Sequence, residues 1–333
     1  MNSGKVVSTS ERIEKLLRLL ADGRFHSGED LAQQLSVSRT AIWKLIQKIE
    51  SWQINIFSVR GKGHQISGGL RLLDKDLLTQ SLKNNKYFKQ IDVLTSVDST
   101  ADYMARQWRL SPGVGRVCVA EHQTAGRGRK GRSWISPFAA NLYFSIGVEL
   151  PLGLSALGGL SLAIGLSMVQ TINQLAETPV KIKWPNDLLV NHQKVAGILV
   201  EANGESHDTS FLNIGVGINW DMQHQQGEPI DQPWANLKPL LVKSVTRNEL
   251  LAKLLVDLDE TLNIYQQQGF EPFSSLWPAL SAVYQQPVHI ITPQDTYSGT
   301  EAGIESNGAL RLETPQGIKI FHSGEVSLRK VLD

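Results

Sequence analysis

The stretch VKIKWPNDLLVNHQKVAGILVE at residues 180–201 decides the fold of the central part of the chain. It contains three runs with strand character, at residues 180–184, 187–191 and 194–201. The turn Asn191-His192-Gln193 is too short for a parallel connection, which needs a crossover of a dozen or more residues. The stretch therefore predicts neighbouring antiparallel strands within a mixed or mainly antiparallel sheet.

Further strand-like runs and helical patterns surround this stretch. The strand-like runs lie at residues 91–94, 117–121, 141–149 and 211–219. Apolar residues at helical spacing lie at residues 74–83, 99–109, 155–175 and 246–268. This order of elements predicts an α+β domain in which helices flank one mixed sheet.

From Tyr284 onward the pattern changes to short strand-like runs separated by turn residues. These runs lie at residues 288–291, 299–304, 309–313, 318–322 and 326–328. Five short strands in a segment of this size predict a small SH3-like β-barrel at the C-terminal end.

A segment rich in glycine and arginine lies between two of the predicted strands. It reads Gln123-Thr124-Ala125-Gly126-Arg127-Gly128-Arg129-Lys130-Gly131-Arg132-Ser133-Trp134. Glycine lets backbone N–H groups turn toward a ligand, and arginine supplies planar donors that match phosphate or carboxylate oxygens. The segment therefore predicts a site for a nucleotide, a phosphate or an acyl phosphate. Composition alone leaves a mobile, solvated basic loop as the alternative.

Two nucleotide-binding patterns match this segment in part. Gly126, Gly128 and Gly131 satisfy G-x-G-x-x-G, and residues 126–133 nearly satisfy the Walker A pattern, with Arg132 in place of its lysine. Both patterns need a helix directly afterwards. Because Pro137 and a strand-like run follow instead, we expect both matches to be accidental.

Three amphipathic helices and a hairpin are predicted before residue 67. The first helix ends near Asp22-Gly23, the second covers 31–35 after a capping signal at 27–30, and the third runs from Arg39 to about Ser51 with Ser38 as its N-cap. Two strand-like runs, at 54–59 and 64–66, follow with a turn at 60–63 between them. This order predicts a winged helix-turn-helix.

The N-terminal module also carries the positive charge of the chain. Residues 1–66 contain ten Lys or Arg against six Asp or Glu, whereas the rest of the chain has a net charge of −3. We expect the third helix to enter the major groove of DNA and the wing to reach phosphates. The expected DNA contacts are Ser38, Arg39, Thr40, Trp43, Lys44, Gln47, Lys48, Arg60 and Lys62. The alternatives are a small protein-interaction module and, for Trp43, packing against a neighbouring element.

The composition is that of an ordinary soluble globular protein. The chain has 333 residues, of which 41% are hydrophobic and 20% charged, which allows two or three domains. No apolar run is long enough to span a bilayer and no secretory signal is evident, so we expect a cytoplasmic protein. The single cysteine, Cys118, lies in an apolar run and predicts a buried strand residue. No metal-binding cluster and no thiol nucleophile are indicated.

The short break Ser67-Gly68-Gly69 predicts a domain boundary. We expect a winged helix-turn-helix at 1–66, a linker at 67–72, a central domain at 73–283 and the C-terminal domain at 284–333.

The order of motifs along the chain resembles that of the family of bifunctional biotin protein ligases and biotin-operon repressors. The motifs are Asp98-Ser99-Thr100, Gln123 with the loop at 126–134, KWPND at 183–187, KVAGILVE at 194–201, GVGIN at 215–219 and SGEVSLR at 323–329. The resemblance covers nearly the whole chain, and GRGRxGRxW followed by KWPND and K-x-AGIL is highly specific.

The resemblance implies a two-step ligase reaction. Biotin and ATP, with Mg²⁺, would give biotinyl-5′-AMP and pyrophosphate, with no tightly bound cofactor. Biotin would then pass to a lysine on the biotin carboxyl carrier protein of acetyl-CoA carboxylase.

The resemblance also assigns residues to this reaction. Implied catalytic residues are Lys194, Arg129 and Asp187. Implied biotin contacts are Ser99, Thr100, Ala101, Gln123, Arg127, Gly128, Arg129 and Lys194. Implied ATP or adenylate contacts are Arg129, Arg132, Trp134, Asn186, Gly215, Asn219 and Trp234. Residues 220–236 resemble a loop that orders over the adenylate and is disordered before the ligand arrives.

Two of these residues need comment. Asp187 orients or deprotonates the incoming amine, assists magnesium, or merely caps a turn; the sequence does not separate these roles. Ala101 stands where the family commonly has asparagine, which removes an amide from the biotin end of the site.

As a regulator, the resemblance implies an adenylate-bound homodimer that binds operator DNA and represses biotin-synthesis genes. Two alternatives remain open at this point. One is a repressor that senses a small anion without catalysis, and the other is a lipoate or octanoate ligase.

Overall fold

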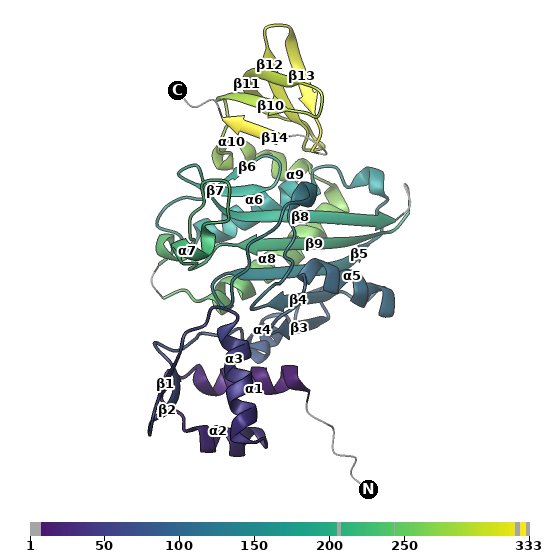
Figure 1. Ribbon diagram of the computed structural model, residues 1–333. Helices are drawn as coiled ribbons and strands as arrows, with labels where there is room; N and C mark the ends of the chain where they lie inside the picture. Colours follow the sequence, from purple (N-terminus) through teal and green to yellow (C-terminus); the bar gives the residue numbers. More distant parts are fainter. Residues whose placement is uncertain (1–7, 205–207, 243, 324–326, 331–333) are drawn as a thin grey trace.

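The computed structural model describes residues 8–204, 208–242, 244–323 and 327–330. Figure 1 shows three regions in succession along the molecule. Helices and a hairpin form the N-terminal end, a large sheet with helices forms the middle, and a small sheet forms the C-terminal end.

The N-terminal region is the predicted winged helix-turn-helix. Its elements are α1 (Thr9–Leu20), α2 (Gly28–Leu35), α3 (Arg39–Glu50), β1 (Ile56–Val59) and β2 (Gly63–Ile66). The Ser38 side chain accepts a hydrogen bond from the Ala41 N–H at 3.2 Å, and this cap satisfies one unpaired donor at the start of α3. Apolar side chains from all three helices and the hairpin form one core, which confirms the periodicity argument.

The central region is built on a seven-stranded mixed sheet. Its strands are β3 (Gln90–Leu94), β4 (Arg116–Ala120), β5 (Leu142–Leu150), β6 (Lys181–Lys183), β7 (Asp187–Val190), β8 (Gln193–Gly204) and β9 (Ser210–Ile218). They lie in the order β3-β4-β5-β9-β8-β7-β6. Only the β3–β4 pair is parallel, so the prediction of a mainly antiparallel sheet is confirmed.

Helices cover both faces of this sheet. The elements are α4 (Lys75–Ser81), α5 (Thr100–Leu110), α6 (Leu160–Asn173), α7 (His224–Gly227), α8 (Arg247–Gln268), α9 (Glu271–Ser274) and α10 (Trp277–Leu280). α6 and α8 pack over the main core. α5 packs on the opposite face, where Met104, Phe211 and the buried Cys118 form a separate cluster.

The helix expected at 155–175 begins later than predicted, at Leu160. A short 3₁₀ turn at Leu154–Ala156 precedes it. Gly159 has φ +79°, a left-handed conformation that favours glycine and separates this turn from the helix. The apolar periodicity continues across this interruption, so the predicted helix was too long at its N-terminal end.

The C-terminal region is a five-stranded antiparallel sheet. Its strands are β10 (Pro287–Ile291), β11 (Thr296–Ile304), β12 (Leu310–Thr314), β13 (Gly317–Phe321) and β14 (Ser327–Lys330). They lie in the order β13-β12-β11-β10-β14. This small sheet is fastened to the central region, because the Trp277 indole donates to the buried Glu301 carboxylate at 2.8 Å and the Trp184 indole donates to the Gly308 carbonyl at 3.1 Å.

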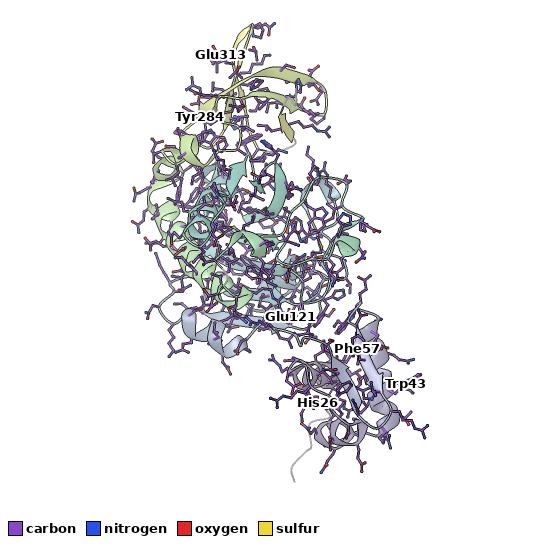
Figure 2. The ribbon with its side chains drawn as sticks, turned by 90° about the vertical axis from the view of Figure 1, so that its left-hand side faces the viewer. His26, Trp43, Phe57, Glu121, Tyr284 and Glu313 are labelled. Carbon is purple, nitrogen blue, oxygen red and sulfur yellow. The ribbon has the colours of Figure 1, made fainter. Side chains whose placement is uncertain are left out.

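The N-terminal module meets the central region at the end of β4 (Figure 2). Trp52 stacks on Phe138 with ring centroids 5.2 Å apart, and its ring lies 5.7 Å from that of His122. Beside this contact, Glu121 and Arg247 form an ion pair at 2.8 Å, with both side chains only 5% exposed.

None of the helices in the described part of the chain is long and apolar enough to cross a membrane.

We predict that Glu121→Gln destabilises the protein by about 3–5 kcal/mol, because it leaves the buried Arg247 guanidinium without its counter-charge. The measurement is the free energy of unfolding from urea denaturation. Glu14→Gln is the matched control, since the Glu14–Arg18 pair has side chains 41% and 48% exposed and should contribute less than about 1 kcal/mol. Equal losses in the two variants would contradict the prediction.

Candidate active site

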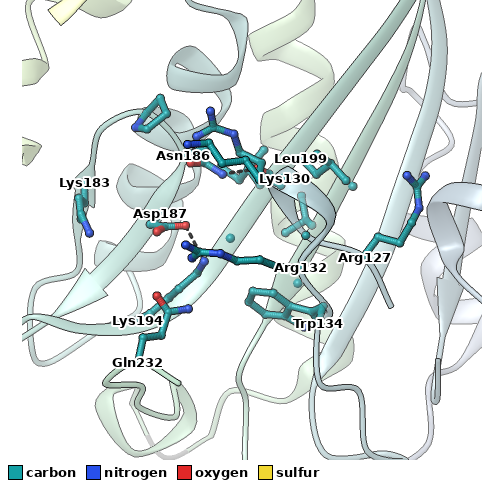
Figure 3. Close-up of a pocket in the computed structure, with 18 of the residues that line it drawn as sticks. Arg127, Lys130, Arg132, Trp134, Lys183, Asn186, Asp187, Lys194, Leu199 and Gln232 are labelled. Carbon is teal, nitrogen blue, oxygen red and sulfur yellow. Dashed lines mark hydrogen bonds and ion pairs between the residues drawn. The ribbon is translucent and has the colours of Figure 1, made fainter. Parts of the chain in front are cut away.

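One cavity of about 550 Å³ collects most of the residues that the sequence assigned to the reaction (Figure 3). It is lined by the arginine-rich loop, the start of α5, the turn between β6 and β7, the strands β8 and β9, and two residues of β14. The assigned residues that line it are Ser99, Thr100, Ala101, Gln123, Arg127, Gly128, Arg129, Arg132, Trp134, Asn186, Asp187, Lys194 and Gly215.

A hydrogen-bonded polar group forms one end of the cavity. Ser99 is the N-cap of α5, and Thr100 donates to the Gln123 side-chain oxygen from its backbone N–H at 2.9 Å and from its hydroxyl at 3.1 Å. The Gln123 amide in turn donates to the Ser136 hydroxyl at 2.9 Å. Ser145 donates to the Thr100 hydroxyl at 2.9 Å from within the sheet. The arrangement supplies several oriented polar groups that can recognise a neutral polar ring.

The arginine-rich loop returns on itself rather than leading into an α-helix. A single 3₁₀ turn covers Arg129–Gly131. The Gly128 N–H donates to the Arg132 carbonyl at 2.7 Å, and the Trp134 N–H donates to the Gly126 carbonyl at 2.8 Å. The chain then runs into β5, so both nucleotide-binding patterns were accidental matches, as predicted.

Trp134 lies flat on the sheet at the floor of the cavity. A side chain on Gly217 would overlap its indole, and a Cβ on Gly197 would come within 3.0 Å of it. The Lys194 ammonium lies 5.3 Å from the centre of the same ring. Two glycines on neighbouring strands therefore provide the space in which the indole rests.

Lys194 and Asp187 form a close ion pair at the opposite end from the polar group. Their charged atoms lie 2.6 Å apart, with side chains 16% and 20% exposed. Arg129 donates to the Asn186 side chain at 2.9 Å and to the Ser323 carbonyl at 2.5 Å. Burial lowers the pKa of Arg129 from its usual value, but an arginine remains charged in proteins. This end of the cavity therefore suits an anion.

Arg127 lies differently from the other cations of the loop. Its guanidinium donates to both carboxylate oxygens of Glu201, at 2.9 and 3.0 Å, and lies 2.9 Å from Asp102. Figure 3 shows it pointing away from the Lys194–Asp187 pair. The segment at 123–134 was expected to present its arginines to an anion, but the structure separates Arg127 from Arg129.

Ser145, Lys183 and Arg329 are among the lining residues that the sequence did not assign to the site. Lys183 opens the KWPND motif, and Arg329 comes from the SGEVSLR stretch on β14. Burial lowers the pKa of Lys183 below its usual value; Asp187 opposes this, and the nearby cations Lys194, Arg329 and Arg132 add to it. Both lysine and arginine lay within quoted motifs, which was the signal that could have identified them.

Two assigned residues do not line the cavity. The Asn219 side chain donates to the Lys194 carbonyl at 3.1 Å and so helps to fix the backbone of that residue. Trp234 packs against Gly227 of α7 instead of facing the cavity.

The segment at 220–236, which was expected to order over the adenylate, is hydrogen-bonded to Lys194 in the structure. The Lys194 N–H donates to the Pro233 carbonyl at 2.9 Å, and the Ala235 N–H donates to the Lys194 carbonyl at 3.0 Å. These backbone bonds and the packing of Trp234 supply the interactions that polar composition alone did not indicate.

The residues expected to contact DNA are all exposed in the N-terminal module. A second cavity, of about 650 Å³, lies between α2, α3 and the hairpin, and Arg39, Thr40, Trp43 and Arg60 are among its lining residues. Trp43 is 56% exposed, so it does not pack into a neighbouring element. This face offers cations and one aromatic ring to a partner.

Metal ligands are not grouped in the described part of the chain, where no three His, Cys, Asp or Glu side chains come together to suit an ion.

Three family models match successive parts of the chain. The HTH domain matches residues 12–65, the Biotin/lipoate A/B protein ligase family matches residues 93–219, and the Biotin protein ligase C terminal domain matches residues 285–329.

Relatives match over nearly the full length. The bifunctional ligase/repressor BirA of Salmonella typhimurium is 41% identical over 94% of this chain and 96% of its own length. That of Escherichia coli is 40% identical over 95% of this chain and 96% of its own. Among solved structures, the biotin protein ligase of Aquifex aeolicus in complex with biotin and ATP is 32% identical, covers 73% of this chain and 100% of its own, and has a TM-score of 0.62.

We predict that Gly217→Ala displaces Trp134 and destabilises the protein by about 1–3 kcal/mol through overpacking. Gly215→Ala is the matched control two residues earlier on β9, since a Cβ there would meet its nearest atom at an ordinary 3.6 Å. Unfolding free energies and near-ultraviolet circular dichroism of the two variants test this. An unchanged tryptophan signal in Gly217→Ala would contradict it.

Proposed function

This chain belongs to the family of bifunctional biotin protein ligases and repressors, and from that premise we propose that it is an ATP-dependent biotin protein ligase that also represses transcription in response to biotin. The observation that carries the ligase proposal is the cavity itself. A polar end formed by Thr100, Gln123 and Ser145 and a cationic end formed by Lys194 and Arg129 open into one space.

The first step joins two anions, the carboxylate of biotin and the α-phosphate of ATP, to give biotinyl-5′-AMP and pyrophosphate. These groups repel each other unless positive charge is already placed around them. Lys194, Arg129, Arg132 and Lys183 supply that charge within one cavity. Because they are positioned before the reaction, little reorganisation is needed when the charge on the α-phosphate develops.

We infer that the biotin ring occupies the polar end and that its carboxylate points to Lys194. Ser99, Thr100, Ala101 and Gln123 would then surround the ring, with the backbone of 127–129 over it. Trp134, resting on Gly217, would lie beside the adenylate, with Asn186 and Gly215 nearby. Asn219 and Trp234 would act by supporting the backbone on either side of Lys194.

In the second step, a lysine amine of the carrier protein attacks the carbonyl carbon of the mixed anhydride and AMP leaves. An ammonium has three donors, so Lys194 can hold Asp187 and the substrate carboxylate at the same time. Asp187 would thereby orient Lys194 and lie close to the incoming amine, from which it can accept a proton.

Magnesium would be carried with the ATP phosphates, which together with water fill most of its coordination in sites of this kind. The cavity lining contributes two carboxylates, Asp187 and Asp231, for the remaining ligands.

For repression, we propose that the exposed face of α3 and the wing bind operator DNA, through Ser38, Arg39, Thr40, Trp43, Lys44, Gln47, Lys48, Arg60 and Lys62. We also propose a homodimer of the adenylate-bound protein in the cytoplasm. Residues 199–204 of β8 support this, because among the described residues they pair only with β9 and leave one strand edge open. The proposed domains are 1–66, 73–283 and 284–333, with a linker at 67–72.

The two alternatives predict different chemistry. A sensor without catalysis needs no ion pair such as Lys194–Asp187 at the anion end. A lipoate or octanoate ligase would share the adenylation step, but its substrate would not place a hydrogen-bonding ring such as that of biotin at the polar end. Competition between biotin and lipoate for adenylation separates the second alternative from our proposal.

We predict that Lys194→Ala reduces biotin-dependent exchange of pyrophosphate into ATP by about 100-fold or more, as for the loss of a donor to a developing charge. Lys181→Ala is the control, since Lys181 is an exposed lysine on β6 outside the cavity. Failure of the unmodified protein to catalyse the exchange would refute the ligase proposal.

We further predict that affinity for operator DNA, selected from a random pool, rises when biotin and ATP are both present. Arg39→Ala should weaken binding without changing pyrophosphate exchange. A gel shift that is indifferent to both ligands would refute the biotin-responsive part of the proposal.

A further inference from the structure

Arg127 bridges three separate segments of the chain at the rim of the cavity. Its backbone belongs to the arginine-rich loop, while its guanidinium contacts Asp102 on α5 and Glu201 on β8. We call these three residues the Arg127 clasp. The loop is thereby fastened by one side chain to two walls of the cavity.

The charge of Arg127 is already satisfied within the clasp. Two carboxylates lie within 3.0 Å of one guanidinium, and the hydrogen bond to Glu201 raises the pKa of Arg127 above its usual value. Redirecting this cation toward a bound anion would leave both carboxylates without their partner. Arg127 therefore differs from Arg132, which lines the cavity and forms no ion pair with a carboxylate of the described residues.

The clasp is linked by hydrogen bonds to the backbone at the polar end of the cavity. Asn213 on β9 donates from one amide group to the Ala101 carbonyl at 3.0 Å and to Glu201 at 3.2 Å. Asn213 is only 2% exposed. Ala101 is thus held through its backbone by a group that also holds Glu201, so the clasp and the ring-binding turn of α5 form one connected network.

We propose that Arg127 is a positioning residue whose clasp holds the loop closed over the polar end of the cavity and slows release of the ligand bound there. The proposal rests on the proposed function for the identity of that ligand, biotin. Arg127 acts through Asp102 and Glu201, and its side chain does not take part in the chemical step.

This role differs in its consequences from a role in charge stabilisation. If Arg127 stabilised the transition state, Arg127→Gln would lower kcat, and neutralising its carboxylate partners would leave the cation free to act. If it closes the loop, removing any member of the clasp has the same effect. The pairs are partly exposed, with side chains 34–39% accessible, so each is expected to be modest and sensitive to salt.

The test compares Arg127→Gln, Asp102→Asn, Glu201→Gln and the double variant Arg127→Gln/Glu201→Gln in the full-length protein. Arg106→Gln is the control, because Arg106, which is also on α5, forms a similar exposed pair with Asp98 just before the helix without holding the loop through its side chain. The expected result is release of labelled biotin about threefold to tenfold faster in each clasp variant. The KM for biotin should rise, kcat should stay within about twofold, and the double variant should exceed neither single variant by much.

Trypsin provides a readout that does not depend on the ligand, since the loop itself carries cleavage sites at Arg129, Lys130 and Arg132. Cleavage there should be faster in the ligand-free clasp variants than in the wild type or in Arg106→Gln, with melting temperatures recorded to exclude global unfolding. Unchanged cleavage, or a fall in kcat at constant KM for biotin, overturns the clasp. Faster cleavage in variants of a protein that does not bind biotin supports the clasp and refutes the proposed function.

Discussion

The buried ion pair between Glu121 and Arg247 is the interaction on which the junction between the N-terminal module and the central region depends. Removing one partner would leave a charge in an environment with almost no water, so the two must remain together. Arg247 also donates to the carbonyls of Asn141 and Arg71, at 2.9 and 2.6 Å, and Glu121 accepts from the Leu73 N–H at 2.5 Å. The start of α8, the start of β5 and the segment after the N-terminal module therefore meet at one point.

The two residues that follow Glu121 in the chain contact different parts of the molecule. His122 lies against Trp52 of the N-terminal module, and burial lowers its pKa, which favours the neutral ring. Gln123 belongs to the polar end of the cavity, where it accepts from Thr100. Of these three consecutive residues, Glu121 is buried in the interior, His122 contacts the winged helix-turn-helix, and Gln123 lines the cavity.

The cavity obtains its cations from segments that are far apart in sequence. Lys183 comes from β6 and Lys194 from β8, the strands on either side of β7. Arg132 comes from the loop, and Arg329 comes from β14. Cations held this close together repel one another, and the lowered pKa of Lys183 reflects burial together with that repulsion. A bound polyanion would reduce this repulsion. The clasp around Arg127 keeps one further cation out of this group.

Local features of the sequence predicted the elements well, because periodicity, caps and turn length act over a few residues. Ser38 as a cap, the β7–β8 hairpin and the strand after Pro137 all follow from such short-range rules. The direction of a side chain is a different matter. Arg127 and Arg129 are two residues apart in the same loop, yet one faces Glu201, 74 residues away, and the other faces Asn186. Composition treats the two arginines alike, and only the positions of β7 and β8 relative to the loop distinguish them. The same limit applies to Arg247, whose burial depends on a carboxylate at the end of a distant strand. A cation in a motif can therefore be assigned to a substrate only after the carboxylates around it have been located.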